Sequence, residues 1–423
     1  MLKHAFILAA AALSVFAAAP ASDSRTRAMN YWPQWRGPDV NGTAPLAEPP
    51  VQWNEKKNIR WKLAIPGKGH ATPVIWENTI VVLTAVPLEK DAKTLRFVVI
   101  AVDRERGTVL WEKTMCEVKP HEGAHPDGSF ASASAMIDGE RIYAHFGSRG
   151  IYCLDMKGKL LWKKDLGRMK IARGFGEGSS PAMSEKAVFI VWDNETPSFI
   201  AALDKKTGSE IWRTPRDEKT SWSTPVVIRH GGKEIVITSA TKRMRAYDAD
   251  KGSLIWEAGG MTLSTIPSPV YDEARLYAMS GFLGSALIAI PLDVKGEVAE
   301  KQFAWKYSQD ASYVPSALLY NGSIYFIKFT EGALSSLDAK TGKVRYAKEK
   351  IPGLKGVYSS PVAAAGRVYV TGRNGVTAVI SDTAPFKILA TNTLDDQFSA
   401  SAAVVGKEII LRGHRSLYSI MGR

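Results

Sequence analysis

Cysteine is scarce in this sequence of 423 residues, which contains only Cys116 and Cys153. No Cys-x-x-Cys-His pattern is present, which excludes the usual attachment of a haem. An oxidising compartment would permit one disulfide, but the strand contexts of the two cysteines do not obviously face each other. We therefore expect two small buried thiols, and a bridge between them is the less favoured alternative.

Long hydrophobic runs are missing beyond the N-terminus. Lys3, an apolar run from Ala5 to Ala18 and the small residues Ala19-Pro20-Ala21 predict a secretory signal peptide cleaved near Ala21. The apolar run is shorter than the ~20 residues that a membrane-spanning helix needs, and no other stretch approaches that length. No cysteine follows the run, which disfavours a lipid anchor. We expect a periplasmic or secreted protein without a membrane span.

Acidic residues are the minority, since 55 lysines and arginines outnumber 42 aspartates and glutamates and give a formal net charge of +13. The basic residues are scattered along the chain. Clusters such as 242–245 lack interleaved aromatic residues that could stack on bases, so we expect no nucleic-acid partner. Most of this charge is interpreted as solvated surface, and weak attraction to anionic envelope polymers is the functional alternative.

Familiar catalytic patterns are also absent, because no Gly-x-Ser-x-Gly, zinc-protease or phosphate-loop sequence appears. The segment from Lys119 to Asp127 contains two histidines and two carboxylates, but Gly123 and Pro126 argue against the helix that would place both histidines on one face. An exposed loop is the favoured interpretation. Residues 193–195, Asp-Asn-Glu, are typical of a hairpin turn, and a hard-cation site there would need further ligands from a neighbouring segment.

Repeats fill most of the chain. The phrase Asp-x-x-Thr/Lys/Arg-Gly-x-x-x-Trp indicates a β-hairpin, in which Asp accepts backbone hydrogen bonds, Gly adopts positive φ and Trp wedges between neighbouring sheets. It occurs at 103–111, 204–212 and 248–256, with variants at 155–162 and 338–346. We therefore interpret this phrase as a structural motif and not as a functional site.

A second phrase, Ser/Thr-Pro-Val followed by a loop and an alternating strand, precedes each hairpin. Its anchor positions are Pro73, Ala135, Pro181, Pro225, Pro269, Ala317, Pro361 and Ala402. These eight anchors are mostly about 40 to 60 residues apart, which fits one four-stranded blade each. We therefore predict an all-β fold, an eight-bladed β-propeller of antiparallel blades; an open β-solenoid or two sandwich domains are less favoured.

The last repeat has room for only three strands. Residues 58–65, which include Trp61, form an orphan outer strand at the other end of the repeats, so we expect them to pair with the C-terminal strands and close the ring. Blade five delays its Trp to Trp305, which implies a longer connection, and blade seven lacks both the turn Gly and the Trp.

Three regions follow from these patterns: a signal peptide at 1–21, a Trp- and Pro-rich extension at 22–57 and the propeller at 58–423. The extension contains Tyr31-Trp32-Pro33-Gln34-Trp35-Arg36-Gly37-Pro38, whose aromatic surface we expect to pack onto the propeller. A clamp that protects a blade edge is favoured over a lid on a ligand site.

The Ser-Pro-Val and Ala-Leu-Asp-x-x-Thr-Gly-x-x-x-Trp phrases resemble the pyrroloquinoline quinone (PQQ) repeat superfamily from about Asn58 onward. The Trp-Pro-Gln-Trp-Arg-Gly-Pro sequence, with the segments at 130–134, 138–147 and 221–226, is similar to a secreted bacterial branch related to BamB. The superfamily includes quinoprotein alcohol dehydrogenases that hold PQQ and Ca²⁺ at the propeller axis. This chain lacks the adjacent cysteine pair found in many of them and is shorter, so we expect no bound cofactor, no metal and no catalytic residue.

The residues before each anchor lead into the innermost strands and should point into the axial funnel. The candidate ligand-binding residues are His70, Arg173, Glu177, Trp222, Tyr313, Tyr358 and Phe398. Aromatic and polar groups together suit an extended polar ligand, a glycan or a peptide, although they could equally fill and plug a narrow channel. As funnel residues, Trp222, Tyr358 and Phe398 should not be fully buried.

The sequence thus favours a monomeric binding or scaffold protein whose partner is an envelope protein or a glycan. A PQQ-dependent alcohol or sugar dehydrogenase is the first alternative. A polysaccharide-active propeller enzyme is the second, and it would need paired acid and base groups, for which only Glu177, His70 and the tyrosines are available.

Overall fold

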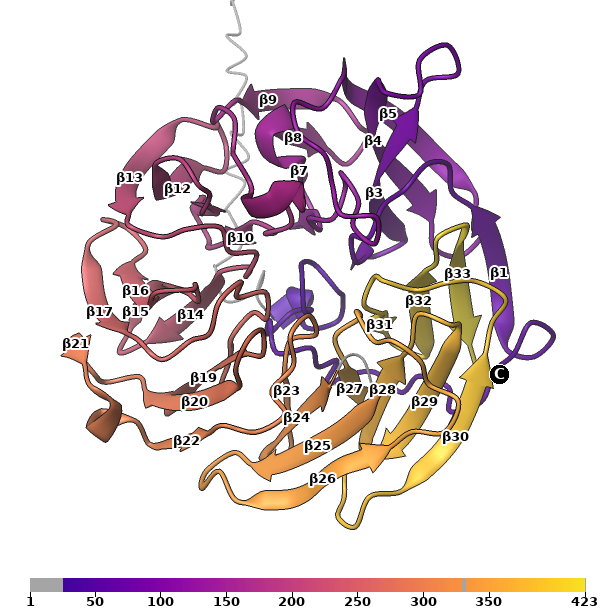
Figure 1. Ribbon diagram of the computed structural model, residues 1–423. Coiled ribbons are helices and arrows are strands. Elements are labelled where there is room, and N and C mark those ends of the chain that lie inside the picture. The colour runs from indigo at the N-terminus through magenta and orange to yellow at the C-terminus, as the bar shows by residue number, and fades with distance from the viewer. Residues whose placement is uncertain (1–25, 329–331, 423) are drawn as a thin grey trace, which may run out of the picture.

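The computed structural model describes residues 26–328 and 332–422 (Figure 1). Within these residues, eight β-sheets are arranged radially around a common axis, which confirms the predicted eight-bladed propeller. The predicted signal peptide lies outside the described residues. No helix in the described part of the chain has the length and apolar character required to cross a membrane.

Each blade is a meander with its first strand at the axis. Blade one contains β2 (Val74–Trp76), β3 (Thr79–Pro87), β4 (Leu95–Asp103) and β5 (Val109–Val118). Blade two contains β6 (Met136–Ile137), β7 (Arg141–His145), β8 (Ile151–Asp155) and β9 (Leu160–Lys164). Blade three contains β10 (Ala182–Met183), β11 (Ala187–Trp192), β12 (Ser198–Asp204) and β13 (Glu210–Arg216). Blade four contains β14 (Val226–His230), β15 (Lys233–Thr238), β16 (Met244–Asp248) and β17 (Leu254–Ala258).

The second half of the ring repeats the pattern. Blade five contains β18 (Val270–Tyr271), β19 (Arg275–Ser280), β20 (Ala286–Pro291) and β22 (Trp305–Tyr307). Blade six contains β23 (Leu318–Tyr320), β24 (Ser323–Lys328), β25 (Ala333–Asp338) and β26 (Val344–Lys350). Blade seven contains β27 (Val362–Ala364), β28 (Arg367–Thr371), β29 (Val376–Ser381) and β30 (Ile388–Thr393). Blade eight contains β31 (Ala403–Val405), β32 (Glu408–Arg412), β33 (Ser416–Met421) and, outermost, β1 (Ile59–Ala64). Three short 3-10 helices lie in connections: η1 (Gly147–Arg149), η2 (Ala172–Gly174) and η3 (Glu300–Gln302).

The ring closes as predicted. Strand β1 pairs antiparallel with β33, with Lys62 opposite Tyr418. The Trp61 indole donates a hydrogen bond to the Arg104 carbonyl of blade one at 2.8 Å. One strand therefore completes blade eight and fastens it to blade one, which leaves no free edge between the ends of the repeat array.

The repeated hairpin has the expected local chemistry. In blade three, Asp204 Oδ1 accepts hydrogen bonds from the backbone N–H groups of Lys206 and Thr207. Gly208 then adopts φ +72°, a left-handed conformation that glycine reaches without strain. The Trp162 ring of the preceding blade lies directly against Gly208, and its indole donates to the Lys205 carbonyl at 3.0 Å. The tryptophan therefore packs on the turn of the next blade.

The two irregular blades differ for separate reasons. Before Trp305, the chain forms β21 (Gly296–Val298), which adds parallel to β17 of blade four, so the expected longer connection is present. At the border of blades six and seven, Tyr346 stands where the repeat has Trp, and its ring meets Phe386 edge-on at a centroid distance of 5.4 Å. A smaller aromatic pair thus replaces the Trp-on-glycine contact.

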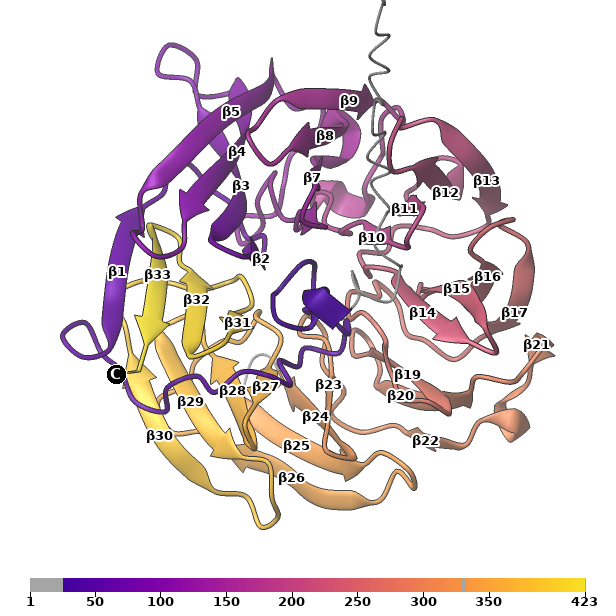
Figure 2. The same cartoon turned by 180° about the vertical axis from the view of Figure 1, so that it is seen from behind.

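The N-terminal extension crosses one face of the channel (Figure 2). Trp32 is fully buried and exchanges two backbone hydrogen bonds with Ile75 of blade one. The Arg36 guanidinium donates to the carbonyls of Ala317 and Pro361 at 2.7 and 2.6 Å, at the innermost strands of blades six and seven. The extension packs onto the propeller, as expected, and leads into β1; the contacts of Arg36 lie at the innermost strands and not at the outer edge of a blade.

Both cysteines are unbridged thiols. Cys153 is buried opposite Trp162 in blade two, and burial raises the pKa of its thiol to about 12. Cys116 is only half-buried, near the end of β5. The preference for free thiols is confirmed, although one of them is less buried than expected.

Candidate functional site

The channel has one mouth covered by the extension and another formed by loops. In each blade the outermost strand runs antiparallel to the innermost strand, so it ends where the innermost strand of the next blade begins. The innermost strands therefore all run in the same direction. The loops that lead into them, together with the loops joining second and third strands, therefore gather at the other end. We call this end the loop mouth.

At the loop mouth, side chains from distant parts of the sequence meet. Asp127, in the loop that leads into blade two, accepts a hydrogen bond from Arg373 Nη2 of blade seven at 2.6 Å. The Tyr358 hydroxyl also donates to Asp127, at 3.1 Å, and the Arg373 guanidinium lies 4.5 Å from the centre of the Tyr358 ring. Lys68 Nζ donates to the Pro126 carbonyl at 2.6 Å. The loop entering blade two thus reaches past blades one and eight to blade seven.

Electrostatics stabilise this contact. The hydrogen bond from Arg373 is the main cause that lowers the pKa of the Asp127 carboxyl, so this group is ionised at neutral pH. The side chains of Arg373 and Asp127 remain 28% and 35% exposed. A ligand at the loop mouth could therefore reach both charges and the Tyr358 ring.

Beside this cluster, two histidines stack. The rings of His70 and His414 are 5.0 Å apart and inclined by 19°, and His414 Nε2 lies 3.1 Å from the Ser399 hydroxyl. Burial, followed by neighbouring cationic groups that include Arg412, lowers the pKa of His70 to about 3. Both imidazoles lie at the junction of blades eight and one.

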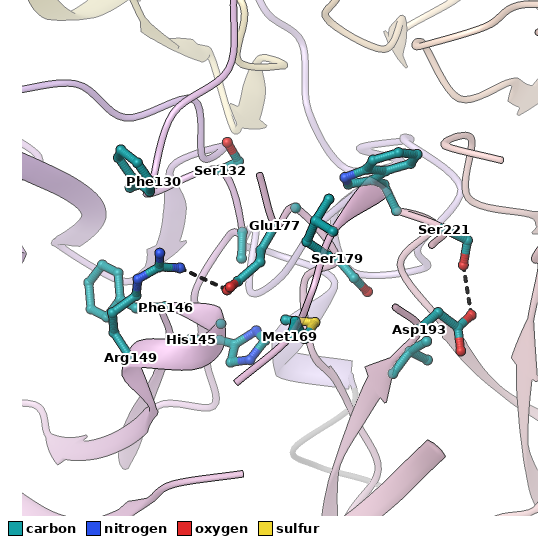
Figure 3. Close-up of a pocket in the computed structure, with 16 residues that line it drawn as sticks. Phe130, Ser132, His145, Phe146, Arg149, Met169, Glu177, Ser179, Asp193 and Ser221 are labelled. Carbon is teal, nitrogen blue, oxygen red and sulfur yellow. Dashed lines mark hydrogen bonds and ion pairs between the residues drawn. The ribbon is translucent and has the colours of Figure 1, made fainter. Parts of the chain in front are cut away.

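Glu177 and Trp222 belong to a separate cavity between blades two and three (Figure 3). Glu177 accepts hydrogen bonds from the backbone and the hydroxyl of Ser148 and pairs with Arg149 at 3.0 Å. The Trp222 indole donates to the Gly176 carbonyl at 2.7 Å. The buried His145 also lines the cavity, and burial lowers the pKa of its imidazole to about 4.

The remaining predicted residues have different surroundings. Arg173 is exposed in η2 at φ +56°, and the half-buried Tyr313 ring stacks on Phe282 at 4.8 Å. Phe398 is completely buried, so the expectation that it stays accessible was wrong. Its backbone bridges to Gly413, which places the ring beneath the short loop between β32 and β33 and against Tyr418 at 5.8 Å. Phe398 is a core residue.

Two local clusters in the sequence have structural roles. Asp193 sits in the loop between β11 and β12, where Arg216 holds both carboxylate oxygens at 2.7 and 2.9 Å and Ser221 donates a further hydrogen bond. The turn interpretation is therefore confirmed. The 119–127 segment is a non-helical loop with exposed His121 and His125, as expected, but its Asp127 is tied to blade seven.

The carboxylates of Glu177 and Asp193 do not fit a Ca²⁺ site. A hard cation such as Ca²⁺ requires six to eight oxygen ligands. Glu177 and Asp193 already bind Arg149 and Arg216, and each would have to exchange an arginine for the cation. Within residues 26–328 and 332–422, no three His, Cys, Asp or Glu side chains gather as metal ligands would.

Comparison with known proteins identifies the family of this chain. The profile of the family described as "Outer membrane protein assembly factor BamB" matches residues 51–198 and 196–416. The chain belongs to this BamB family. Solved structures agree on the fold: BamB from Moraxella catarrhalis has 12% identity and a TM-score of 0.61, covering 86% of this chain and 97% of its own.

A europium-containing methanol dehydrogenase also shares the fold of this BamB-family chain, with 13% identity, a TM-score of 0.67 and coverage of 93% and 92%. At such identities the likeness concerns the fold alone. Subunit 1 of the ER membrane protein complex from Xenopus laevis is 30% identical over 105 residues, which are 25% of this chain and 10% of that subunit. The matched segment thus spans about a tenth of that relative's length.

The sequence pattern proposed His70 and Tyr358 as binding residues but did not single out their neighbours, Asp127, Arg373, Arg412 and His414. Asp127 was noticed only as part of a loop. Arg373 and His414 lie in loops between second and third strands, which carry no repeated motif. Only the loops that lead into the innermost strands were considered as sources of binding residues. The loops between second and third strands lie at the same end of the blades and contain Arg373 and His414.

Proposed function

We propose that this BamB-family propeller is a non-enzymatic binding or scaffold protein of the cell envelope, and that its loop mouth binds an acidic glycan. The observation that carries the proposal is the Asp127, Tyr358 and Arg373 cluster, in which an aromatic face and two partly exposed charges are brought together from blades two and seven. Aromatic faces with a few fixed polar groups suit sugar rings.

Charge at the loop mouth favours an acidic chain over a neutral one. Lys68 and Arg373 contribute two cationic groups around the single carboxylate of Asp127. Lys68 is exposed, and Arg173 adds another exposed cation among the loops that lead into blade three. Attraction of anionic groups to such a surface would speed encounter and weaken as salt increases.

Glu177 and His70, two of the candidate acid–base residues, are too far apart to act together in a hydrolase or lyase. Glu177 lies in the cavity between blades two and three, where Arg149 and Ser148 engage its carboxylate. His70 lies at the junction of blades eight and one, stacked on His414 and with its pKa lowered to about 3. A paired mechanism needs both groups at one bond of the substrate. This separation supports binding without catalysis.

Isothermal titration with a uronic-acid oligosaccharide, a neutral glucan of the same length and an acidic peptide would test the proposal. We expect the uronic-acid chain to bind best, and Tyr358→Ala and Arg373→Gln to weaken it by about tenfold or more, or about 1.4 kcal/mol. The matched control is Arg345→Gln, which removes a partly exposed arginine paired with Asp338 in the outer hairpin of blade six, away from the loop mouth. Preferred binding of the peptide would instead indicate a protein partner.

A second assay addresses the dehydrogenase alternative. Purified protein supplied with PQQ and either Ca²⁺ or a lanthanide ion should give no dye-linked oxidation of alcohols or sugars, because Glu177 and Asp193 are committed to arginines. Measurable turnover would overturn the non-enzymatic proposal.

A further inference from the structure

Arg412, the last residue of β32, is a buried cation. It is 1% exposed, and its Nε, Nη1 and Nη2 atoms have no hydrogen-bond acceptor within the described residues. Asp396 is near enough to act on it electrostatically but does not form an ion pair with it. The carboxylate of Asp396 instead accepts hydrogen bonds from the backbone N–H groups of Arg415 and Ser416.

Other buried arginines of this protein have partners. Arg36 places Nη1 and Nη2 on three backbone carbonyls. Arg216 pairs with both oxygens of Asp193 and donates to the hydroxyls of Thr238 and Tyr247. A guanidinium has five N–H donors, and a buried charge left unpaired is strongly destabilising. Arg412 therefore lacks an acceptor that the fold provides elsewhere.

A second polar side chain near Arg412 has a buried nitrogen that makes no hydrogen bond to a described residue. This atom is His70 Nε2, for which residues 26–328 and 332–422 provide no partner. Arg412 is among the cationic groups that lower the pKa of both His70 and His414, so all three side chains lie within electrostatic range. Lys68 and Arg373 act on the same two imidazoles. An anion at this position would accept hydrogen bonds that no described residue accepts.

We propose that Arg412, together with the His70 imidazole, binds a monovalent anion at the junction of blades eight and one. The guanidinium supplies the charge and two or more N–H donors, and the imidazole supplies one further N–H when its proton resides on Nε2. The anion is either a free ion such as chloride or the carboxylate of a longer molecule that enters from the loop mouth. If the anion is a free ion, the proposal is independent of the glycan-binding function proposed above. If it is a ligand carboxylate, the proposal rests on that function and adds a contact to it.

Crystals of the full chain soaked in sodium bromide would test the site directly. Bromide scatters anomalously, so we expect a peak within hydrogen-bond distance of the Arg412 guanidinium. A second soak with bromide plus the uronic-acid oligosaccharide distinguishes the sources: loss of the peak with sugar density in its place identifies a ligand carboxylate, and persistence identifies a free ion. The absence of any anion at Arg412 in both soaks would overturn the proposal.

Thermal unfolding in solution provides a second measurement. Sodium chloride should raise the melting temperature of the parent protein more than sodium methanesulfonate at equal ionic strength, because only the smaller ion fits a buried site. Arg412→Met should lose this chloride-specific increase, whereas Arg415→Met, at a side chain 64% exposed in the loop that follows β32, should keep it. An equal chloride response in Arg412→Met would contradict the site, and if that variant does not fold, the bromide soak of the parent protein decides.

Discussion

Trp162 of blade two lies so close to Gly208 of blade three that a Cβ atom on the glycine would fall 2.6 Å from the indole ring. The contact joins the outer strand of one blade to the turn of the next. The same geometry recurs around the ring where Trp61, Trp111, Trp212 and Trp305 meet Gly107, Gly158, Gly252 and Gly342. At these junctions, a tryptophan ring packed against a glycine joins one blade to the next.

This contact predicts the effect of adding one methyl group. Gly208→Ala should destabilise the protein by about 3 kcal/mol or more, because it combines positive φ with a clash against an indole ring packed from another blade. Gly296 is the matched control: it has a similar φ of +67° but no atom within 4 Å of its Cβ position. Gly296→Ala should cost only about 1 kcal/mol. Urea unfolding measures both, and equal losses would show that the tryptophan contact is unimportant.

Ring closure should depend on Trp61. Trp61→Ala removes its packing on Gly107 and its hydrogen bond to the Arg104 carbonyl, and we expect a loss of about 3 to 5 kcal/mol. Leu283→Ala, at a side chain 76% exposed, should have little effect and serves as control. A melting temperature of Trp61→Ala within a degree or two of the parent would contradict this role.

Phe398 and Tyr358 should respond oppositely to substitution. Phe398→Ala opens a cavity against Tyr418 in the core, so we expect a loss of about 3 to 5 kcal/mol in stability. Tyr358→Phe removes only the half-buried hydroxyl that donates to Asp127, so its stability should change by about 1 kcal/mol or less. Melting temperature and glycan titration on both variants check this. A stable Phe398→Ala protein would contradict its assignment to the core.

The Asp127–Arg373 contact should open in acid. Because the folded-state pKa of Asp127 is lowered, the contact contributes fully above the ordinary carboxyl value of about 3.9 and is lost as pH falls below it. Limited proteolysis should then cut the 119–130 loop faster at low pH. Asp127→Asn should be cut at this faster rate already at neutral pH, whereas Asp91→Asn, in an exposed loop of blade one, should behave like the parent.

His145 predicts a second pH dependence, in stability. The unfolded chain takes up a proton near pH 6.5, but the buried imidazole does so only near its folded pKa of about 4. Between these values the unfolded state binds more protons, so stability decreases as pH falls, by on the order of 3 kcal/mol in total. His145→Gln should flatten this part of the curve, with a remaining slope from His70. Urea midpoints measured from about pH 7 to about pH 4 would reveal an unchanged slope if His145 does not contribute.

The propeller fold could be predicted from the sequence because the residues that specify each hairpin lie close together in the chain. The Asp, Gly and Trp of one hairpin occupy nine consecutive positions, and the Trp then needs only the next repeat as its partner. The loop mouth was only partly readable. Asp127 and Arg373 are 246 positions apart in the sequence, and no periodicity links them. Phe398 was wrongly expected to be accessible, because comparing the repeats predicts that its segment leads toward the axis but does not predict the short loop that covers its ring.

The closing strand has a consequence for the order of biosynthesis. Strand β1 is synthesised before every other strand of the propeller, yet its partner β33 (Ser416–Met421) is synthesised after all of them. Until β33 emerges, Trp61 and the edge of β1 have no partner in blade eight, and unpaired strand edges in incomplete chains are prone to aggregate. Ring closure therefore has to wait until all eight repeats have been synthesised, and until then the outer edge of blade eight stays incomplete.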